Sequence, residues 1–421
     1  MPFIFLQDVR SKIDYAEKWC FIMNKKSEFD ASASMLGYLY QIRFGLYLAL
    51  KKLPEVDDPE QFNISIEKLD DVAFDKNGAA IELLQTKFHG SPGNLTDRSA
   101  DIWKTIRVWV EAMKNGDVVL GRTTLTLVTT QSLPENTIAY YLSPEAGRDT
   151  AKALELMLSI STEENATNLK GYTAFQSLSE AQKKAFVDDI YIVGKSDNLM
   201  QIRSKICRYG RQYVASEWVD AFVDRIEGVW LQWCIKGLSQ NPSGVINLGD
   251  VQDFADKIRP EYTDTNLPSE FLDVLPDILE FDKDERNFVQ QLHLFSAPKG
   301  MIEQAIVNYF RAFEQRNKWA TDGLLKPGEL GGYDRRLQEQ WVEHRSFLEL
   351  NCEIESEQDK RRYSAALYQS CLQKGVVPIR KDFLEYYVAK GSYHILAEQL
   401  KIGWHPDYLA MLGDSSNENV A

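Results

Sequence analysis

The stretch ISIEKLDDVAFDKNGAAIELLQTKFHG, residues 64–90, decides the fold of the N-terminal part of the chain. It reads as two short strands around a tight turn at Asp75-Lys76-Asn77-Gly78, because Asn-Gly is a strong hairpin signal. Carboxylates precede the turn. Gln85 and Lys87 follow it two residues apart, so both side chains point to one face of the second strand.

The turn type decides which aspartate shares that face. A two-residue type I′ turn on Asn77-Gly78 would bring Asp70 to it. A type I turn with Gly78 in a G1 bulge makes a three-residue loop and brings Asp71 instead. The Asp-x-Asn-Gly order favours the bulged turn, and the same register would put Glu67 across from Lys87.

The rest of the first half alternates helices and strands, which predicts an α/β core. Residues 38–53, YLYQIRFGLYLALKKL, are apolar nearly all round and predict a buried helix. We also expect a helix over 101–116 that closes at Gly116, strands at 123–130 and 189–194, and helical segments around 145–160 and 178–188. From about residue 245 strand signals almost vanish, and segments 301–320 and 333–350 have helical periodicity.

The sequence thus predicts an α/β domain over residues 1–240, a mixed sheet flanked by helices, followed by an all-α domain over 241–421. The 421 residues carry a net charge of -14. Residues 1–115 hold 15 lysines and arginines against 17 aspartates and glutamates, so -12 falls on the remainder. Affinity for phosphate backbones depends on lysine and arginine, so any nucleic-acid-binding surface must be a local basic patch.

The location of the protein is also predicted from composition. No apolar run approaches the roughly 18 residues of a membrane-spanning helix, and the first residues lack the basic-then-apolar order of a signal peptide. The five cysteines form no C-x-x-C pair, and no histidine stands at ligand spacing from them. We expect a cytoplasmic protein without membrane contact.

A carboxylate and a lysine at the ends of adjoining strands are the groups that metal-assisted phosphodiester cleavage needs. Mg²⁺, or Mn²⁺ in its place, takes oxygen ligands from carboxylates, carbonyls and water. Asp71 would bind the metal, and Lys87 would orient the attacking water or offset charge on the phosphate. The alternative is an exposed hairpin that merely carries charges. Gln85 would complete the metal shell, with the carbonyl of Thr86 as a further ligand, and Glu67 or Asp70 would assist. The predicted site residues are therefore Glu67, Asp70, Asp71, Gln85, Thr86 and Lys87.

Several segments occur in the order seen in PD-(D/E)xK-like nucleases with a Q-x-K variant. They are SASMLGYLYQIRFGLYLAL (32–50), ISIEKLDDVAF (64–74), IELLQTKFHG (81–90), LTDRSADIWKTIRVW (95–109) and LTLVTT (125–130). More narrowly, the chain resembles the nuclease effector subunit of ABC-three-component, Lamassu-type antiphage systems. The resemblance continues through 178–194, 301–325 and 391–413. Gln85 departs from the aspartate or glutamate of the wider superfamily, which leaves one metal contact neutral.

The resemblance implies that residues 1–240 form a restriction-endonuclease-like domain and that the all-α domain over 241–421 binds partners. It also implies a double-stranded DNA endonuclease that an SMC-like ABC ATPase and a small third subunit hold inactive. Activity would follow release and self-association into an oligomer such as a tetramer. The chain has no G-x-x-x-x-G-K-[ST] loop, so a partner must supply any ATPase. A non-catalytic adaptor that keeps the nuclease-like fold for DNA or protein binding is the alternative, and a purely structural subunit is a third.

Four further residues are candidates for DNA contact. Arg98, Lys104 and Arg107 fall around the start of the helix after the hairpin, where cations and backbone N–H groups suit phosphate. They could equally form a solvated helix face. Gln41, on the predicted buried helix, either lines the site or is a satisfied core polar group.

Overall fold

The computed structural model describes residues 32–89, 93–144, 147–239, 244–276, 284–351, 353–374 and 376–413. The chain forms two compact units. The first comprises Met1–Tyr209 and Arg225–Phe254, and the second Gly210–Asp224 and Ala255–Ala421. The two units are separated by how compactly their residues pack, and not by function. The predicted functional boundary at residue 240 therefore stays a prediction.

One mixed sheet of six strands organises the first unit, in the order β5-β4-β3-β2-β1-β6. The strands β1, β2 and β3 are antiparallel, β6 adds to β1 in the antiparallel sense, and β3, β4 and β5 are parallel. Their bounds are β1 (Phe62–Ile66), β2 (Val72–Lys76), β3 (Ala79–Lys87), β4 (Thr124–Thr129), β5 (Ile190–Val193) and β6 (Val245–Asn247).

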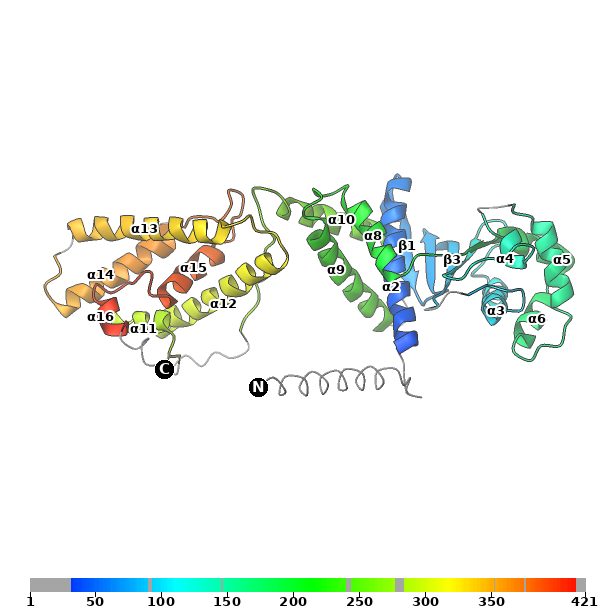
Figure 1. Cartoon of the computed structure of the whole chain (residues 1–421), viewed down its shortest axis with the longest axis horizontal. Helices are drawn as coiled ribbons and strands as arrows, with labels where there is room; N and C mark the ends of the chain where they lie inside the picture. Colours follow the sequence, from blue (N-terminus) through cyan, green and yellow to red (C-terminus); the bar gives the residue numbers. More distant parts are fainter. Residues whose placement is uncertain are drawn as a thin grey trace, which may run out of the picture. The chain divides into compact units, whose positions relative to one another are not determined.

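Helices cover both faces of this sheet. Figure 1 shows β1 and β3 between α2 on one side and α3 to α6 on the other. The helices are α2 (Ser32–Lys52), α3 (Ala100–Asn115), α4 (Ile138–Tyr141), α5 (Thr150–Ile160), α6 (Leu169–Gln176), α7 (Glu180–Asp189), α8 (Leu199–Gly210), α9 (Val219–Ser239) and α10 (Leu248–Ile258). The mixed sheet flanked by helices confirms the predicted fold class of the N-terminal part.

The two faces follow from the period of two along each strand. On one face α2 approaches β1 so closely that a Cβ at Gly45 would lie 2.7 Å from Ile66 Cδ1. On the other face, Leu83 and Leu125 join the tryptophans of α3, Trp103 and Trp109, in one buried core. Gln85 and Lys87 have the parity of Leu83, so they lie on the α3 side of the sheet.

Most element predictions for the first half are confirmed. The predicted strands at 123–130 and 189–194 are β4 and β5. Gly116 ends α3 with φ 86°, in the left-handed conformation that glycine adopts most easily. The helix α2 is less buried than predicted, because Tyr40 is 1% exposed but Tyr38 is 59% exposed. A helix of 21 residues is about 32 Å long, longer than the strands beneath it.

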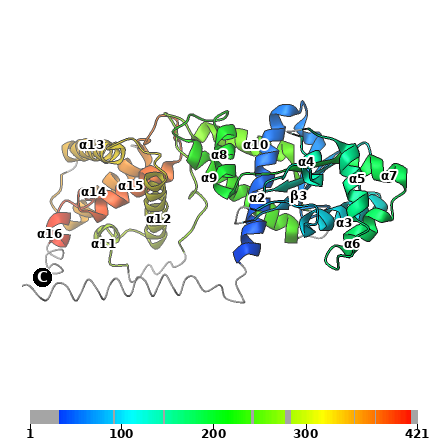
Figure 2. The same ribbon diagram turned by 45° about the vertical axis from the view of Figure 1, so that its right-hand side comes forward.

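Helices are the regular elements in the described residues of the second unit. Its helices after α10 are α11 (Asn287–Leu294), α12 (Lys299–Thr321), α13 (Glu329–Asn351), α14 (Glu357–Gln369), α15 (Tyr386–Glu398) and α16 (Tyr408–Leu412), seen also in Figure 2. The helices α12 and α15 pack so closely that a Cβ at Gly391 would lie 2.0 Å from Asn308 O. The predicted all-α C-terminal part is thereby confirmed. No helix in the described ranges is both long and apolar enough to cross a membrane.

Candidate functional site

The hairpin between β2 and β3 closes with a two-residue turn. Lys76 pairs with Ala79 across it. Asn77 (φ 51°) and Gly78 (φ 83°) both have positive φ, as a type I′ turn requires. The favoured prediction of a three-residue loop is therefore wrong. The physical reason is that Asn77 itself adopts the left-handed conformation, which asparagine tolerates better than most residues.

A β-bulge brings Asp71 to the face of the sheet that was predicted for it, the face of Gln85. It lies between Phe74 and Asp75 and shifts the pairing by one residue, so that Val72 faces Leu84. Continued by one position, this register places Asp71 opposite Gln85. An unbulged two-residue hairpin would have brought Asp70 there. Asp71 therefore shares the face of Gln85, although a different turn places it.

The stretch before the hairpin is two strands and not one. After Ile66 the chain reverses, and β2 returns antiparallel to β1. Glu67 lies in this reversal with φ 56°, an uncommon conformation for a residue with a side chain, and its N–H donates to Asp71 O at 3.1 Å. The predicted pairing of Glu67 with Lys87 is thus wrong, because Asp71 is the neighbour of Glu67 across the reversal.

The side-chain amide of Gln85 connects both aspartates to Lys87. Its Nε2 donates to Asp71 Oδ1 at 2.8 Å and also to Asp70 Oδ1. Its Oε1 accepts from Lys87 Nζ at 2.6 Å, and Lys87 Nζ lies 4.0 Å from Asp71 Oδ2. We call Asp70, Asp71, Gln85 and Lys87 the carboxylate–amide cluster.

Asp71 caps the open edge of β3. The β2–β3 ladder ends at Val72 and Leu84, so Thr86 lies beyond it. Thr86 donates to Asp71 Oδ2 through its N–H at 2.7 Å and through its hydroxyl at 2.9 Å. In a strand the N–H and C=O of one residue point to the same side. The Thr86 carbonyl is therefore on the same edge as the Asp71 carboxylate.

Asp70 is the most enclosed carboxylate of the cluster, 6% exposed. Its Oδ1 accepts from the N–H of Asp71 at 3.0 Å, and its Oδ2 accepts from Trp109 Nε1 on α3 at 2.6 Å. Burial raises the pKa of Asp70 to about 6, opposed by the hydrogen bonds from Trp109 and Gln85 and reinforced by the charge of Asp71. The role of Trp109 could not be read from the sequence, since it has the pattern of a core tryptophan.

Glu67 and Gln41 extend the cluster toward α2. Desolvation and the Asp71 charge raise the pKa of Glu67, while a hydrogen bond from Gln41 and the charge of Lys87 lower it. The structure thus brings all of these side chains together. The Oε1 atom of Gln41 is buried without a hydrogen-bond partner, so Gln41 is not the fully satisfied core group of the alternative interpretation.

The candidate DNA-binding residues Arg98, just before α3, and Lys104 and Arg107, on α3, differ in their ion pairs. Arg98 makes a two-pronged ion pair with Glu163, with bonds of 2.7 and 2.6 Å. Arg107 lies 3.8 Å from Glu111. Lys104 is exposed and has no ion pair within the described part of the chain. The assignment of these three residues to DNA contact stays a prediction.

Oxygen atoms that could hold a divalent cation collect at the Asp71 edge. They are the carboxylates of Asp71 and Glu67, the Thr86 carbonyl and the unpartnered Gln41 Oε1. Such a set fits Mg²⁺, which uses one or two carboxylates and completes its shell with water. Gln85 Oε1 keeps one lone pair beyond its bond from Lys87. Three histidine, cysteine, aspartate or glutamate side chains do not gather as a metal site anywhere in the described ranges, so carbonyl and amide oxygens would be needed.

His89 follows Lys87 on the same face and is paired with α3. Its Nε2 lies 2.8 Å from Asp101 Oδ2, and its N–H donates to Thr130 Oγ1 at 2.9 Å. Both contacts fasten the end of β3 to its neighbours. They explain the position of His89 without a role in chemistry.

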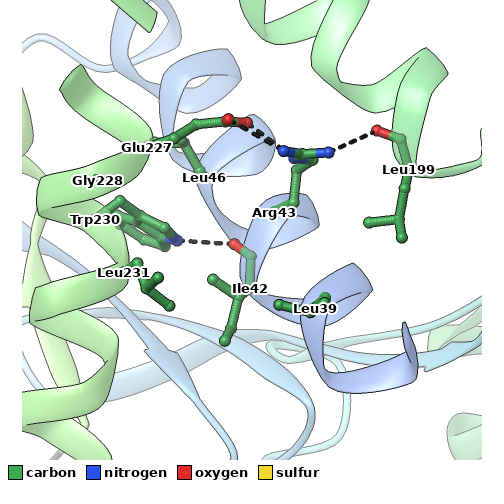
Figure 3. A pocket seen from close by; sticks show the side chains of 9 residues that line it. All are labelled: Leu39, Ile42, Arg43, Leu46, Leu199, Glu227, Gly228, Trp230 and Leu231. Carbon is green, nitrogen blue, oxygen red and sulfur yellow. Dashed lines mark hydrogen bonds and ion pairs between the residues drawn. The ribbon is translucent and has the colours of Figure 1, made fainter. Parts of the chain in front are cut away.

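A separate pocket of about 280 Å³ lies between α2, α8 and α9. Figure 3 shows Arg43 inside it, donating to Glu227 at 2.9 and 3.1 Å and to Leu199 O at 3.3 Å. Leucines form most of the remaining wall. Since its charged groups are paired with one another and no predicted site residue lines it, this pocket is not part of the candidate site.

Comparison with known protein families finds one match, which lies in the second unit. Residues 288–412 match the family model of C-terminal domain 7 of the ABC-three component (ABC-3C) systems. The matched range runs from α11 to α16. No curated protein matches the chain. The matched domain supports membership of this chain in an ABC-three-component defence system.

Proposed function

We propose that the first unit is a metal-dependent endonuclease that cleaves phosphodiester bonds of double-stranded DNA. The observation that carries this proposal is the bond of 2.6 Å from Lys87 Nζ to Gln85 Oε1, which holds the ammonium 4.0 Å from Asp71 Oδ2. A fixed cation beside a carboxylate suits metal-assisted phosphodiester hydrolysis, because the carboxylate can bind the metal and the ammonium can stabilise negative charge on the phosphate.

Each residue has a distinct task in this proposal. Asp71, Glu67 and the Thr86 carbonyl would hold Mg²⁺ or Mn²⁺ at the edge of β3. The cation, when bound, supplies a Lewis acid for the phosphate and lowers the pKa of a water. Lys87 donates a hydrogen bond to the attacking water or to a phosphate oxygen. Gln85 fixes the ammonium of Lys87 and, being neutral, adds no negative charge to a site that must admit phosphate.

The chain would act as the effector of a Lamassu-type ABC-three-component system. The domain match over 288–412 supports such a system, and the remainder of the chain after residue 115 carries -12 of the net charge. An acidic region repels DNA and suits a partner protein with a basic surface. An SMC-like ABC ATPase and a small third subunit would keep the nuclease inactive, and released chains would associate into an oligomer.

Cleavage of plasmid DNA by the full chain, purified without its partners, tests the proposal. Wild-type protein should cut with Mg²⁺ or Mn²⁺ and stop with EDTA. Lys87→Ala should lose about 10²–10³ of the rate and keep its melting temperature, because the side chain is 23% exposed and opens no core cavity. Lys76→Ala is the matched control, since this lysine of the same hairpin lies over the Phe62 ring at 5.0 Å, outside the cluster.

Two outcomes would refute the assignment. If Lys87→Ala cuts at the wild-type rate, the site has been placed wrongly. If the wild-type chain binds DNA but cuts with neither metal, a non-catalytic adaptor with a nuclease-like fold is the better description.

A further inference from the structure

A continuous chain of hydrogen bonds runs from the core of the first unit to Lys87. Trp109 Nε1 on α3 donates to Asp70 Oδ2 at 2.6 Å. The other oxygen of Asp70 accepts from Gln85 Nε2, and Gln85 Oε1 accepts from Lys87 Nζ at 2.6 Å. Each link has one donor and one acceptor, so the position of each group depends on the one before it.

Chemistry allows only one orientation of the Gln85 amide in this chain. Its Nε2 has two hydrogens, and the two aspartate oxygens in front of it are acceptors. The reversed amide would turn Oε1 toward two carboxylates and Nε2 toward an ammonium, with like groups facing each other at both ends. The ionised Asp70 therefore fixes the direction in which Gln85 presents its oxygen to Lys87.

We propose that Trp109 is a positioning residue for the cleavage reaction, acting through Asp70 and Gln85 on the ammonium of Lys87. The inference rests on the proposed function and adds a residue from the core to it. The indole ring lies in the buried core with Leu83 and Leu125, so its N–H has a fixed direction. A phenylalanine would fill most of the same space and lack the donor.

The hydrogen bonds of Asp70 define what loss of this donor would do. Asp70 Oδ1 accepts from the N–H of Asp71 and from Gln85 Nε2, whereas Oδ2 accepts from Trp109 Nε1. Without the indole N–H, Oδ2 would lose this bond and the carboxylate could rotate about its Cβ–Cγ bond. Gln85 would then lose the fixed acceptor that sets the direction of its amide, and its Oε1 would no longer hold the ammonium of Lys87 in one place.

Trp109→Phe in the full chain tests the inference, with Trp103→Phe as the matched control. Trp103 is also fully buried on α3, and its indole donates to Asp97 O at 2.7 Å, away from the cluster. Trp109→Phe should slow plasmid cleavage about tenfold or more at pH 7. The loss should fall on kcat and leave the KM for DNA unchanged, because Lys87 acts on the reacting phosphate, whereas a purely structural defect would lower the amount of active protein and the thermal stability. Trp103→Phe should keep the wild-type kcat and KM.

A second readout separates this inference from the proposed function. The side-chain amide signals of Gln85, followed by NMR, should shift in Trp109→Phe and stay in Trp103→Phe, whether or not the chain cuts DNA. If Trp109→Phe unfolds, an isosteric benzothiophene side chain at position 109 removes only the N–H. A wild-type kcat in the folded variant, or unshifted Gln85 amide signals, would overturn the inference.

Discussion

Replacing the Gln85 amide by a carboxylate is the sharpest test of the carboxylate–amide cluster. Gln85→Glu keeps the size of the side chain and adds a negative charge. In this chain it would set an oxygen where Nε2 now donates to Asp70 and to Asp71, 2.8 Å from the latter. Two hydrogen bonds would become two contacts between like charges.

The expected loss of folding stability depends on which costs less free energy, charge repulsion or uptake of a proton. Two unit charges about 4 Å apart repel by about 4 kcal/mol in an effective dielectric of about 20, so two such contacts cost about 8 kcal/mol. Holding a proton at pH 7 on a glutamate with an unfolded pKa of about 4.3 costs about 3.7 kcal/mol. Proton uptake is cheaper, and the three carboxyl groups would share that proton as a coupled set.

The sign of the pH dependence is then fixed. The folded-state pKa of the new carboxyl is raised above its unfolded value, so the folded variant holds a proton that the unfolded chain releases. Relative to wild type, the variant loses stability as pH rises above about 4.3, by about 1.4 kcal/mol per pH unit. The difference should be about 2 kcal/mol at pH 6 and about 4 kcal/mol at pH 7.

Thermal unfolding at pH 6, 7 and 8 measures this difference. For a unit of this size 1 kcal/mol is about 2–4 °C, so the melting temperature should fall by about 10 °C at pH 7. Gln61→Glu is the control, because Gln61 Nε2 also donates to an aspartate, Asp58, at 2.8 Å, but in an exposed position. It should change stability by less than about 1 kcal/mol. A deficit of Gln85→Glu that is the same at pH 6 and pH 8 would refute the reasoning, and a deficit that Mg²⁺ narrows would support a cation site.

The remaining predictions concern the two aspartates and the control of the chain. Asp71→Asn should reduce the cleavage rate and raise the Mg²⁺ requirement more than Asp70→Asn, because Asp71 lies on the open edge beside the Thr86 carbonyl and Asp70 is enclosed. Cleavage rates measured against Mg²⁺ concentration check this. The reverse order would assign the metal ligand to Asp70. Expressed with its genomic neighbours, the chain should sit in a larger complex and cut little, whereas the free chain should self-associate and cut; a free chain that stays monomeric and cuts fully contradicts this account.

Local sequence patterns predicted those helices and strands that are determined by the residues within them. Gly116 ends α3 because the helix needs a residue with positive φ there. The strands β4, TLTLVT, and β5, IYIV, are short runs rich in the threonine, valine and isoleucine residues that favour strands. The strand β6 was not predicted, because three residues carry too little pattern and only its pairing with β1 defines it.

The candidate site was predictable in composition and less so in geometry. The parity of Gln85 and Lys87 follows from the strand period alone, so their shared face could be read directly. The choice between Asp70 and Asp71 depended on the turn and on the bulge at Phe74, and the bulge leaves no sequence signal. The bond from Trp109 joins segments 39 residues apart, which no local pattern encodes.

The bulge between Phe74 and Asp75 has a consequence for how this region can change in length. Side chains alternate along a strand, so inserting or deleting one residue between Val72 and the turn would turn Asp71 to the opposite face of the sheet. Insertion of one residue into the turn would leave Asp71 on its present face only if the bulge were lost at the same time. The residues of the hairpin can therefore be substituted, but a change of length at the turn must be matched by a change at the bulge. A sequence alignment that places a single gap in the hairpin would align Asp70 of one chain with Asp71 of the other.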